Sequence, residues 1–189
     1  MERRKVLLLS GAVAAGKSAT AKVLVDEHAF RGIRSGTYLL KQAQAAGLDA
    51  SRRGLQELGD SKDVETDFGW LIDEVACPLI DSEPLQRSWL LDCARKEQQV
   101  EHFRRRFPGQ VVHVHLIAPE AELRRRYDAR LAKGGEYLGG TSYDEAVSHP
   151  NEAAARALST IADVVLDTSR DDVLAEVLVA LALLRASGR

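Results

Sequence analysis

The chain has 189 residues, of which 45% are hydrophobic, and its formal net charge is −2. This length allows one domain with a sizeable core, and the hydrophobic content excludes a wholly disordered chain. The nearly balanced charge argues against a nucleic-acid partner.

Apolar runs at intervals along the chain predict the strands of a sheet. Five runs are strand-like: Lys5–Ser10, a weak one at Gly32–Ser35, Ser88–Asp92, Val111–Ile117 and Asp163–Asp167. Segments rich in helix-forming residues lie between and after them: Lys17–His28, Thr37–Ala46, Ser51–Leu58, Asp67–Ile80, Lys96–Phe107, Pro119 to about Lys133, Asn151–Ile161 and Asp171–Ala186. Strands that alternate with helices predict a parallel sheet covered on both faces, which is the α/β class.

The first predicted strand leads into a loop that matches a phosphate-binding pattern. Residues 11–18 read GAVAAGKS and fit G-x-x-x-x-G-K-[ST] between a strand and a helix. The backbone amides of such a loop, together with the positive end of the following helix, attract a phosphate. We expect Lys17 to contact the β- and γ-phosphates and Ser18 to bind Mg²⁺. The residues expected to bind the nucleotide here are Gly11, Ala14, Ala15, Gly16, Lys17, Ser18 and Ala19.

The third predicted strand ends at Asp92, which Arg95 follows three residues later. The carboxyl ends of strands line the ligand crevice of an open α/β sheet, so Asp92 is expected to hold Mg²⁺ or to accept a proton from an acceptor hydroxyl. The guanidinium of Arg95 can bind phosphate in a bidentate way. The sequence contains neither Asp-x-x-Gly nor [NT]-K-x-D, which argues against a GTP-dependent switch.

A second cationic segment reads LRRRYDARLAKGG. Arg126 and Arg130 are four residues apart and share a helix face. The glycine pairs at 134–135 and 139–140 bracket a segment that we expect to be mobile. The pattern indicates a lid that neutralises charge and excludes water, although a surface helix with internal ion pairs is the alternative.

These motifs, in this order, resemble the P-loop nucleoside-monophosphate kinase family, which includes adenylate-kinase-like proteins. The resemblance covers almost the whole chain and implies one P-loop kinase domain, 1–189. It implies a three-layer sandwich whose five-stranded parallel sheet has the order 2-3-1-4-5. It also implies an acceptor-binding helical insertion at 36–86 and a lid region at 126–150. ATP and Mg²⁺ are the implied cofactors, and a small-molecule acceptor is the implied partner.

The resemblance also implies roles for individual residues on the acceptor side. The stretch RSGTYLLKQA matches the opening of the family's acceptor domain, with Thr37 in place of the usual aspartate. Lys41 lies one position after the family's acceptor-phosphate arginine, and Gln99 matches the glutamine that reads the acceptor base. The acceptor-binding residues implied in this way are Ser35, Gly36, Thr37, Lys41, Arg95 and Gln99.

On the donor side, Arg126 matches an arginine that packs on the donor base, and Arg130 matches one that reaches phosphate. Arg95 matches the arginine after the third strand, but adenylate kinases place it one residue further. The shorter spacing resembles phage and archaeal deoxynucleotide-kinase relatives. The catalytic residues implied are Lys17, Asp92, Arg95, Arg126 and Arg130.

The leading hypothesis is therefore an ATP-dependent kinase acting on a nucleotide, with a nucleoside or deoxynucleoside monophosphate as the first expectation. A kinase acting on an alcohol (a nucleoside, a modified base or a small metabolite) is the alternative. Its base could be Asp92 or an acid of the insertion, such as Asp60, Asp63 or Asp67. A regulatory module that binds ATP and hydrolyses it slowly is a third possibility.

Several other features have structural interpretations. His113 and His115 alternate with apolar residues in one strand and are expected to share one of its faces. The sequence HPNE at 149–152 suggests a turn and a helix start, with Asn151 as the cap.

Cysteine content and hydropathy bear on the cellular context. The chain has two cysteines, without metal-ligand spacing, and no apolar run that approaches the roughly 20 residues of a membrane span. A cytoplasmic protein without a membrane partner, either a monomer or a homodimer, is expected.

Overall fold

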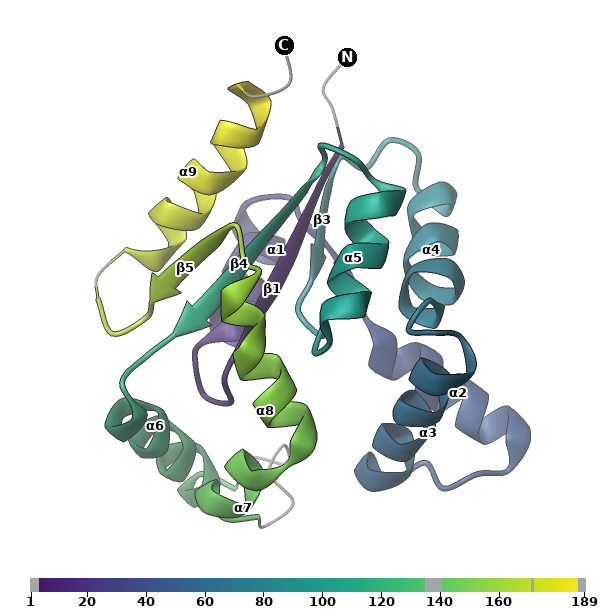
Figure 1. The fold of residues 1–189 in the computed structure, drawn as a ribbon, viewed down its shortest axis with the longest axis vertical. Helices are drawn as coiled ribbons and strands as arrows, with labels where there is room; N and C mark the ends of the chain where they lie inside the picture. The colour runs from purple at the N-terminus through teal and green to yellow at the C-terminus, as the bar shows by residue number, and fades with distance from the viewer. Residues whose placement is uncertain (1–3, 135–140, 171, 187–189) are drawn as a thin grey trace.

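The computed structural model describes residues 4–134, 141–170 and 172–186. Its centre is a five-stranded parallel sheet with the order β2-β3-β1-β4-β5, which confirms the predicted α/β class and strand order (Figure 1). The strands are β1 (Lys5–Gly11), β2 (Arg31–Ile33), β3 (Ser88–Leu91), β4 (Val111–Ile117) and β5 (Val164–Asp167). The weak second run does form a strand, but it ends before Ser35, which already belongs to a helix.

Alternation along β1 divides the core into two layers. Leu7 and Leu9 point to one face of the sheet, where they pack with buried residues of α1 (Lys17–Glu27), α6 (Glu120–Ala132) and α9 (Val173–Ala186). A strand exposes successive side chains to opposite faces, so a run that is apolar throughout has to be covered on both sides. The continuous apolar character of this run is thereby explained.

The other face of the sheet carries the second core layer. Val6 and Leu8 pack there with buried residues of α5 (Glu97–Arg106) and of the helical segment before β3. Figure 1 shows α5 in front of the sheet and α1 behind it. The two layers hold the loop after β1 at the carboxyl edge of the sheet, between the segments inserted after β2 and after β4.

The segment between β2 and β3 is helical but differs from the prediction. It contains α2 (Ser35–Ala46), α3 (Arg52–Glu65), a π-helix η1 (Leu71–Ala76) and α4 (Cys77–Ser82). The predicted stop of the second of these helices at Leu58 is wrong, because α3 continues through Gly59. A Cβ on that glycine would stand 3.4 Å from Leu39 Cδ1 of α2, so the glycine permits close packing of two helices rather than ending one.

The helix predicted over Asp67–Ile80 starts later than its apolar spacing indicates. Asp67 and Phe68 have φ values of 47° and 63°, in the left-handed region, and form a turn after α3. Such values interrupt a right-handed helix, so helical conformation resumes only at Trp70, just before η1. The apolar periodicity is present in the sequence, but it extends across a non-helical turn at Asp67 and Phe68.

The segment after β4 contains α6, α7 (Tyr143–Ser148), α8 (Pro150–Ala157) and a short 3-10 helix η3 (Leu158–Thr160). The prediction of a mobile glycine-bracketed segment falls largely on 135–140, which lie outside the described residues. Asn151 is not the cap of α8: the ring Nδ1 of His149 accepts a 3.1 Å hydrogen bond from the backbone N of Asn151. This leaves the Asn151 side chain available for another contact.

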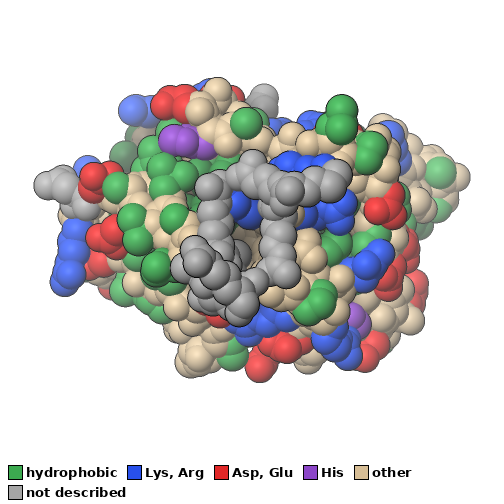
Figure 2. All heavy atoms as spheres, turned by 90° about the horizontal axis from the view of Figure 1, so that it is seen from above, with side chains coloured by type: hydrophobic (Ala, Val, Ile, Leu, Met, Phe, Trp, Pro, Cys, Tyr) green, Lys and Arg blue, Asp and Glu red, His purple; other side chains and the backbone are tan. Residues whose placement is uncertain are grey.

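The start of β1 and the end of α9 both lie at the end of the molecule opposite the loop after β1 (Figure 1). Figure 2 views this end and shows basic, acidic and apolar side chains mixed over it. Within the described ranges, no helix combines the length and the apolar character needed to cross a membrane.

Candidate active site

Two cavities open at the carboxyl edge of the sheet. One, of about 480 Å³, is lined by the loop after β1 and is called the loop cavity below. The other, of about 920 Å³, lies between the sheet and the helices α2 and α3 and is called the insertion cavity. Residues that line both are Ser18, Gln56, Asp92, Cys93, Arg95 and Asn151. The two cavities therefore adjoin, and polar side chains stand at their junction.

The loop after β1 has the backbone that its glycines allow. Gly11 and Gly16 have φ values of 142° and 95°, and a Cβ on Gly11 would collide with the carbonyl oxygen of Leu116 in β4. Most residues predicted to bind nucleotide do line the loop cavity: Gly11, Ala14, Ala15, Gly16, Lys17 and Ser18. Ala19 lines neither cavity.

The ammonium group of Lys17 lies against the loop itself. Its Nζ donates hydrogen bonds to the carbonyl oxygens of Gly11, at 2.6 Å, and Ala12, at 2.8 Å. Burial lowers the pKa of Lys17 to about 8, and the neighbouring Arg95 pulls in the same direction, whereas Glu152 raises it. A buried cation with a cationic neighbour is suited to receive an anion.

Glu152, near the start of α8, reaches the same loop. Its Oε1 accepts a 2.8 Å hydrogen bond from the backbone N of Val13 and a 3.1 Å hydrogen bond from Arg156 Nε. A carboxylate thus accepts the hydrogen bond of a backbone amide that, in a phosphate-binding loop, would be donated to a bound anion. The sequence does not predict this contact, because no local pattern connects the start of α8 with the loop after β1.

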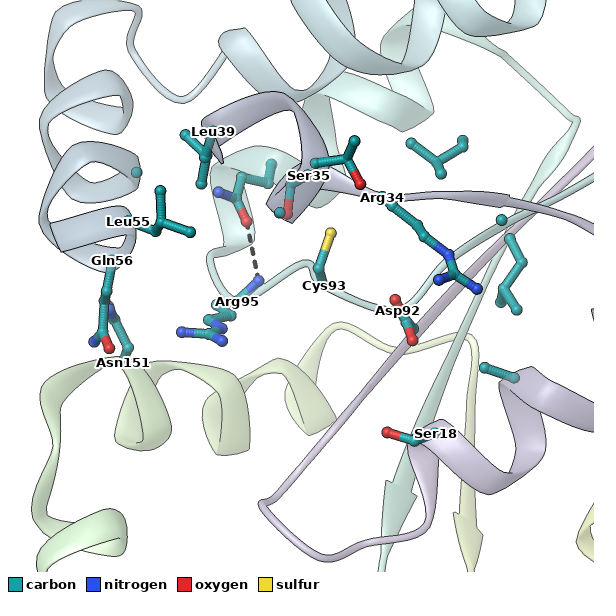
Figure 3. A pocket seen from close by; sticks show the side chains of 18 of the residues that line it. Ser18, Arg34, Ser35, Leu39, Leu55, Gln56, Asp92, Cys93, Arg95 and Asn151 are labelled. Carbon is teal, nitrogen blue, oxygen red and sulfur yellow. Dashed lines mark hydrogen bonds between the residues drawn. The ribbon is translucent and has the colours of Figure 1, made fainter. Parts of the chain in front are cut away.

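Asp92 and Ser18 face the junction of the two cavities. In Figure 3 the carboxylate of Asp92 lies between the Ser18 hydroxyl and the guanidinium of Arg34. Within the described residues no group of three or more His, Cys, Asp or Glu side chains could hold a metal ion. A hydroxyl and a carboxylate are nevertheless the hard oxygen ligands that Mg²⁺ takes when water and phosphates complete its shell. These two residues fit the predicted Mg²⁺ site.

The two arginines predicted to share a helix face are placed differently. Arg130 is exposed and lines the loop cavity together with Tyr127. Arg126 lines neither cavity: its Nη1 donates to Thr168 Oγ1 at 2.8 Å, its Nη2 to Thr168 O at 2.9 Å, and its Nε to Glu122 Oε1 at 2.7 Å. In this arrangement Arg126 ties α6 to the end of β5.

The residues predicted on the acceptor side are also divided. Ser35, Gly36 and Thr37 line the insertion cavity at the start of α2. Lys41 is exposed one turn later and lines neither cavity. Arg34, which the sequence analysis did not single out, lines the insertion cavity as the last residue before α2.

Gln99 lines the insertion cavity, but its amide is used within the protein. Its Oε1 accepts from the backbone N of Arg95 at 2.9 Å, the dashed line in Figure 3, and from that of Lys96 at 3.4 Å. Its Nε2 donates to Asp63 Oδ1 at 3.0 Å.

Helix α8 also contacts the insertion. The Asn151 side chain donates to both carboxylate oxygens of Asp60, at 3.1 and 3.3 Å, and Gln56 Nε2 lies 2.8 Å from His149 Nε2. Asp60 and Asp63 line the insertion cavity, whereas Asp67, the third acid considered as a base, does not. The start of α8 thus contacts α3 on one side and the loop after β1 on the other.

His113 and His115 lie on one face of β4, as expected, and line neither cavity. Ser10 Oγ stands between them, 2.6 Å from His113 Nε2 and 2.8 Å from His115 Nδ1. Burial is the main cause that lowers the pKa of each to about 4. They form a neutral, buried hydrogen-bonded group in the core.

Comparison with known proteins supports the fold. No family model and no curated protein matches the chain. Among solved structures, a protein of Chloroflexus aurantiacus provisionally named as a kinase matches with a TM-score of 0.59 and 13% identity over 100% of both chains. The TT1252 protein of Thermus thermophilus matches with a TM-score of 0.58 and 18% identity, again over 100% of both chains. At these identities the likeness shows a shared fold.

Proposed function

We propose that this protein is an ATP-dependent kinase that transfers the γ-phosphoryl group to a small-molecule acceptor, in the first place a nucleoside or deoxynucleoside monophosphate. The observation that carries the proposal is the junction of the two cavities at Ser18, Asp92 and Arg95. A phosphate-binding loop on one side and an adjoining second cavity on the other are what direct transfer between two bound substrates requires.

The loop cavity suits the donor. Its amides, Lys17 and Arg130 would receive the phosphates of ATP, and Ser18 with Asp92 would hold Mg²⁺. When bound, Mg²⁺ neutralises phosphate charge and orients the β- and γ-phosphoryl oxygens. The kinase name of the similar Chloroflexus aurantiacus protein supports the same assignment.

The insertion cavity suits the acceptor. Its volume of about 920 Å³ admits a nucleotide, and it offers Arg34 and Arg95 near the junction and apolar side chains such as Leu39 and Leu55 further in. Figure 3 shows the two leucines close to each other in the wall of the cavity, one from α2 and one from α3. An acceptor phosphate would lie near the arginines, with the less polar part of the molecule between the helices.

In the transfer itself, an acceptor oxygen forms a bond to the γ-phosphorus while the bond from that phosphorus to the β–γ bridging oxygen breaks and ADP leaves. Lys17 and Arg95 would stabilise the charge on the transferring group. An ionised phosphate acceptor needs no base. An alcohol acceptor would give its proton to a base, and the position of Asp92 at the junction favours that second candidate function.

The test is transfer from ATP and Mg²⁺ to a panel of ribo- and deoxyribonucleoside monophosphates, nucleosides, glucose and gluconate, with products identified by mass spectrometry. We expect acceptor-dependent ADP release and a phosphorylated product. Lys17→Ala should reduce transfer by about 100-fold or more, whereas Arg105→Ala, an equal charge change on the exposed end of α5, should not. ATP binding without transfer to any compound would favour a regulatory module instead.

A further inference from the structure

A buried carboxylate lies in the wall of the insertion cavity. Asp63, on α3, lines the cavity and is 6% exposed. Two donors converge on one of its oxygens: Trp70 Nε1 at 2.7 Å and Gln99 Nε2 at 3.0 Å, both to Oδ1. No hydrogen bond to Oδ2 occurs within the described part of the chain. Within the described residues, Oδ1 therefore has two hydrogen-bond donors from the protein, and Oδ2 has none.

The orientation of the Gln99 amide follows from its other partners. A backbone N–H can only donate, so the oxygen of the amide has to face Arg95 N and Lys96 N. Its NH₂ group then has to face Asp63, and the indole N–H of Trp70 can likewise only donate. Asp63 Oδ1 is thus held in place by two obligate donors.

The environment of Asp63 makes a further donor favourable. Burial raises its pKa, although Trp70, Gln99 and Lys96 oppose that effect. Oδ2 is not among the fully buried side-chain atoms that lack a hydrogen-bond partner in the described ranges, so this oxygen is accessible from the cavity. A ligand that brings an N–H or O–H group to Oδ2 would complete the hydrogen bonding of this carboxylate, whereas a ligand with an acceptor atom there would be repelled.

We propose that Asp63, rather than Gln99, determines acceptor specificity, by accepting at Oδ2 a hydrogen bond from an N–H or O–H group of the acceptor. The inference rests on the proposed function and names the polar group that the acceptor has to present. In a nucleotide this group would be an exocyclic amino group of the base, as in AMP and CMP, or a ring N–H, as in IMP and UMP. In a sugar or polyol it would be a hydroxyl.

The variant Asp63→Asn isolates this role. The asparagine oxygen still accepts from Trp70 and Gln99, and since both are donors, they hold the amide in one orientation. The NH₂ group then replaces Oδ2, so the cavity-facing atom changes from acceptor to donor while the internal hydrogen bonds remain. Glu57→Gln, the same charge change on an exposed residue of α3, is the matched control.

The experiment measures kcat/KM for AMP against IMP, CMP against UMP, and glucose and gluconate, with melting temperature and the KM for ATP as controls. Within each nucleotide pair an amino group is exchanged for a carbonyl oxygen. If the donor is an amino group, wild type prefers AMP or CMP. Asp63→Asn then lowers the amino-to-keto ratio at least 10-fold, with an unchanged KM for ATP.

A hydroxyl can accept as well as donate, so with a sugar acceptor Asp63→Asn should raise the acceptor KM only a few-fold. That smaller change still supports the inference and identifies a hydroxyl as the group that donates to Asp63. If Asp63→Asn does not fold, purine riboside monophosphate, which lacks the amino group of AMP, tests the wild type directly. The expected result is a loss of 10-fold or more relative to AMP.

Two outcomes overturn the inference. In the first, wild type transfers the phosphoryl group, and Asp63→Asn has the same kcat/KM values for all acceptors as wild type and Glu57→Gln. This result rejects the inference but not the proposed function. The second is absence of transfer to any compound by wild type, which rejects the proposed function and the inference with it. The wild-type assay alone separates these two failures.

Discussion

Glu152 and Val13 are 139 residues apart in sequence and are joined by a 2.8 Å hydrogen bond from the backbone N of Val13 to the Glu152 carboxylate. Val13 lies in the loop that would receive the phosphates of ATP, so the carboxylate and a phosphate would compete for the same amide. Because Asn151, the preceding residue, is bonded to Asp60 on α3, the start of α8 is positioned to link the two cavities.

This competition predicts the effect of Glu152→Gln. The substitution removes a negative charge beside the loop after β1, so the dissociation constant for ATP should fall by about 10-fold, which corresponds to roughly 1.4 kcal/mol. Isothermal titration calorimetry measures it, with Glu65→Gln, which removes an exposed carboxylate of α3 that lines neither cavity, as the control. Unchanged or weaker ATP binding would show that Glu152 supports the loop rather than competing for it.

The parts of the fold that the sequence predicts correctly are those encoded locally. The apolar runs of β1 and β4 can be recognised without knowledge of a distant partner, and the structure agrees with them. The break at Asp67 and Phe68 and the continuation of α3 through Gly59 were mispredicted. Glycine ends helices in many chains, but here it admits the neighbouring Leu39.

The site was predictable only in part for a similar reason. Lys17, Ser18, Asp92 and Arg95 each follow a strand or open a helix, so their positions at the carboxyl edge follow from the topology. The contacts of Glu152 depend instead on how helices far apart in the sequence pack together. The internal bonds of Gln99 and Asp63 do so as well, and no local pattern signals such packing.

The different placements of Arg126 and Arg130 predict different consequences of their removal. Arg130→Ala should lower kcat/KM for ATP by about 10- to 100-fold with little change in melting temperature, because the side chain is exposed at the loop cavity. Arg126→Ala should lower the melting temperature by several degrees, because it breaks three hydrogen bonds, to Glu122 and Thr168. Calorimetry and steady-state kinetics on the same preparations distinguish them.

The opposite pattern, with Arg126→Ala stable but inactive, would indicate that Arg126 leaves Thr168 to contact the nucleotide. Arg125→Ala is a suitable control for both variants, since this exposed arginine of α6 bonds only to Glu122 within the described residues.

The buried histidines predict a loss of stability in mild acid. The folded-state pKa values of His113 and His115 are lowered to about 4, from 6.5. Below pH 6.5 the unfolded chain therefore binds protons that the folded chain does not, and the stabilising contribution is complete only above that pH. The free energy of unfolding should fall by on the order of 1 kcal/mol per pH unit for each histidine between pH 6.5 and 4.

Urea denaturation at pH 7, 6 and 5 measures the slope of the free energy of unfolding against pH. His115→Gln should reduce the slope by about half, whereas replacement of the exposed His149 by Gln should leave it unchanged. An unaltered slope in His115→Gln would mean that other groups account for the acid sensitivity.

The lowered pKa of Lys17 predicts how ATP binding depends on pH. Burial brings this pKa to about 8, so the ammonium form that attracts phosphate predominates below pH 8 and is lost above it. Bound phosphates favour the charged form, so ATP binding at higher pH has to be accompanied by proton uptake. The dissociation constant for ATP should rise by up to 10-fold per pH unit from pH 8 to 9.5.

In Lys17→Arg, whose guanidinium stays charged, ATP binding should be weaker at pH 7 but nearly independent of pH from 8 to 9.5. Calorimetric titrations in buffers of different ionisation enthalpy would measure both affinity and proton uptake, and a wild-type affinity that is flat up to pH 9.5 would contradict the assignment of Lys17 to the phosphates.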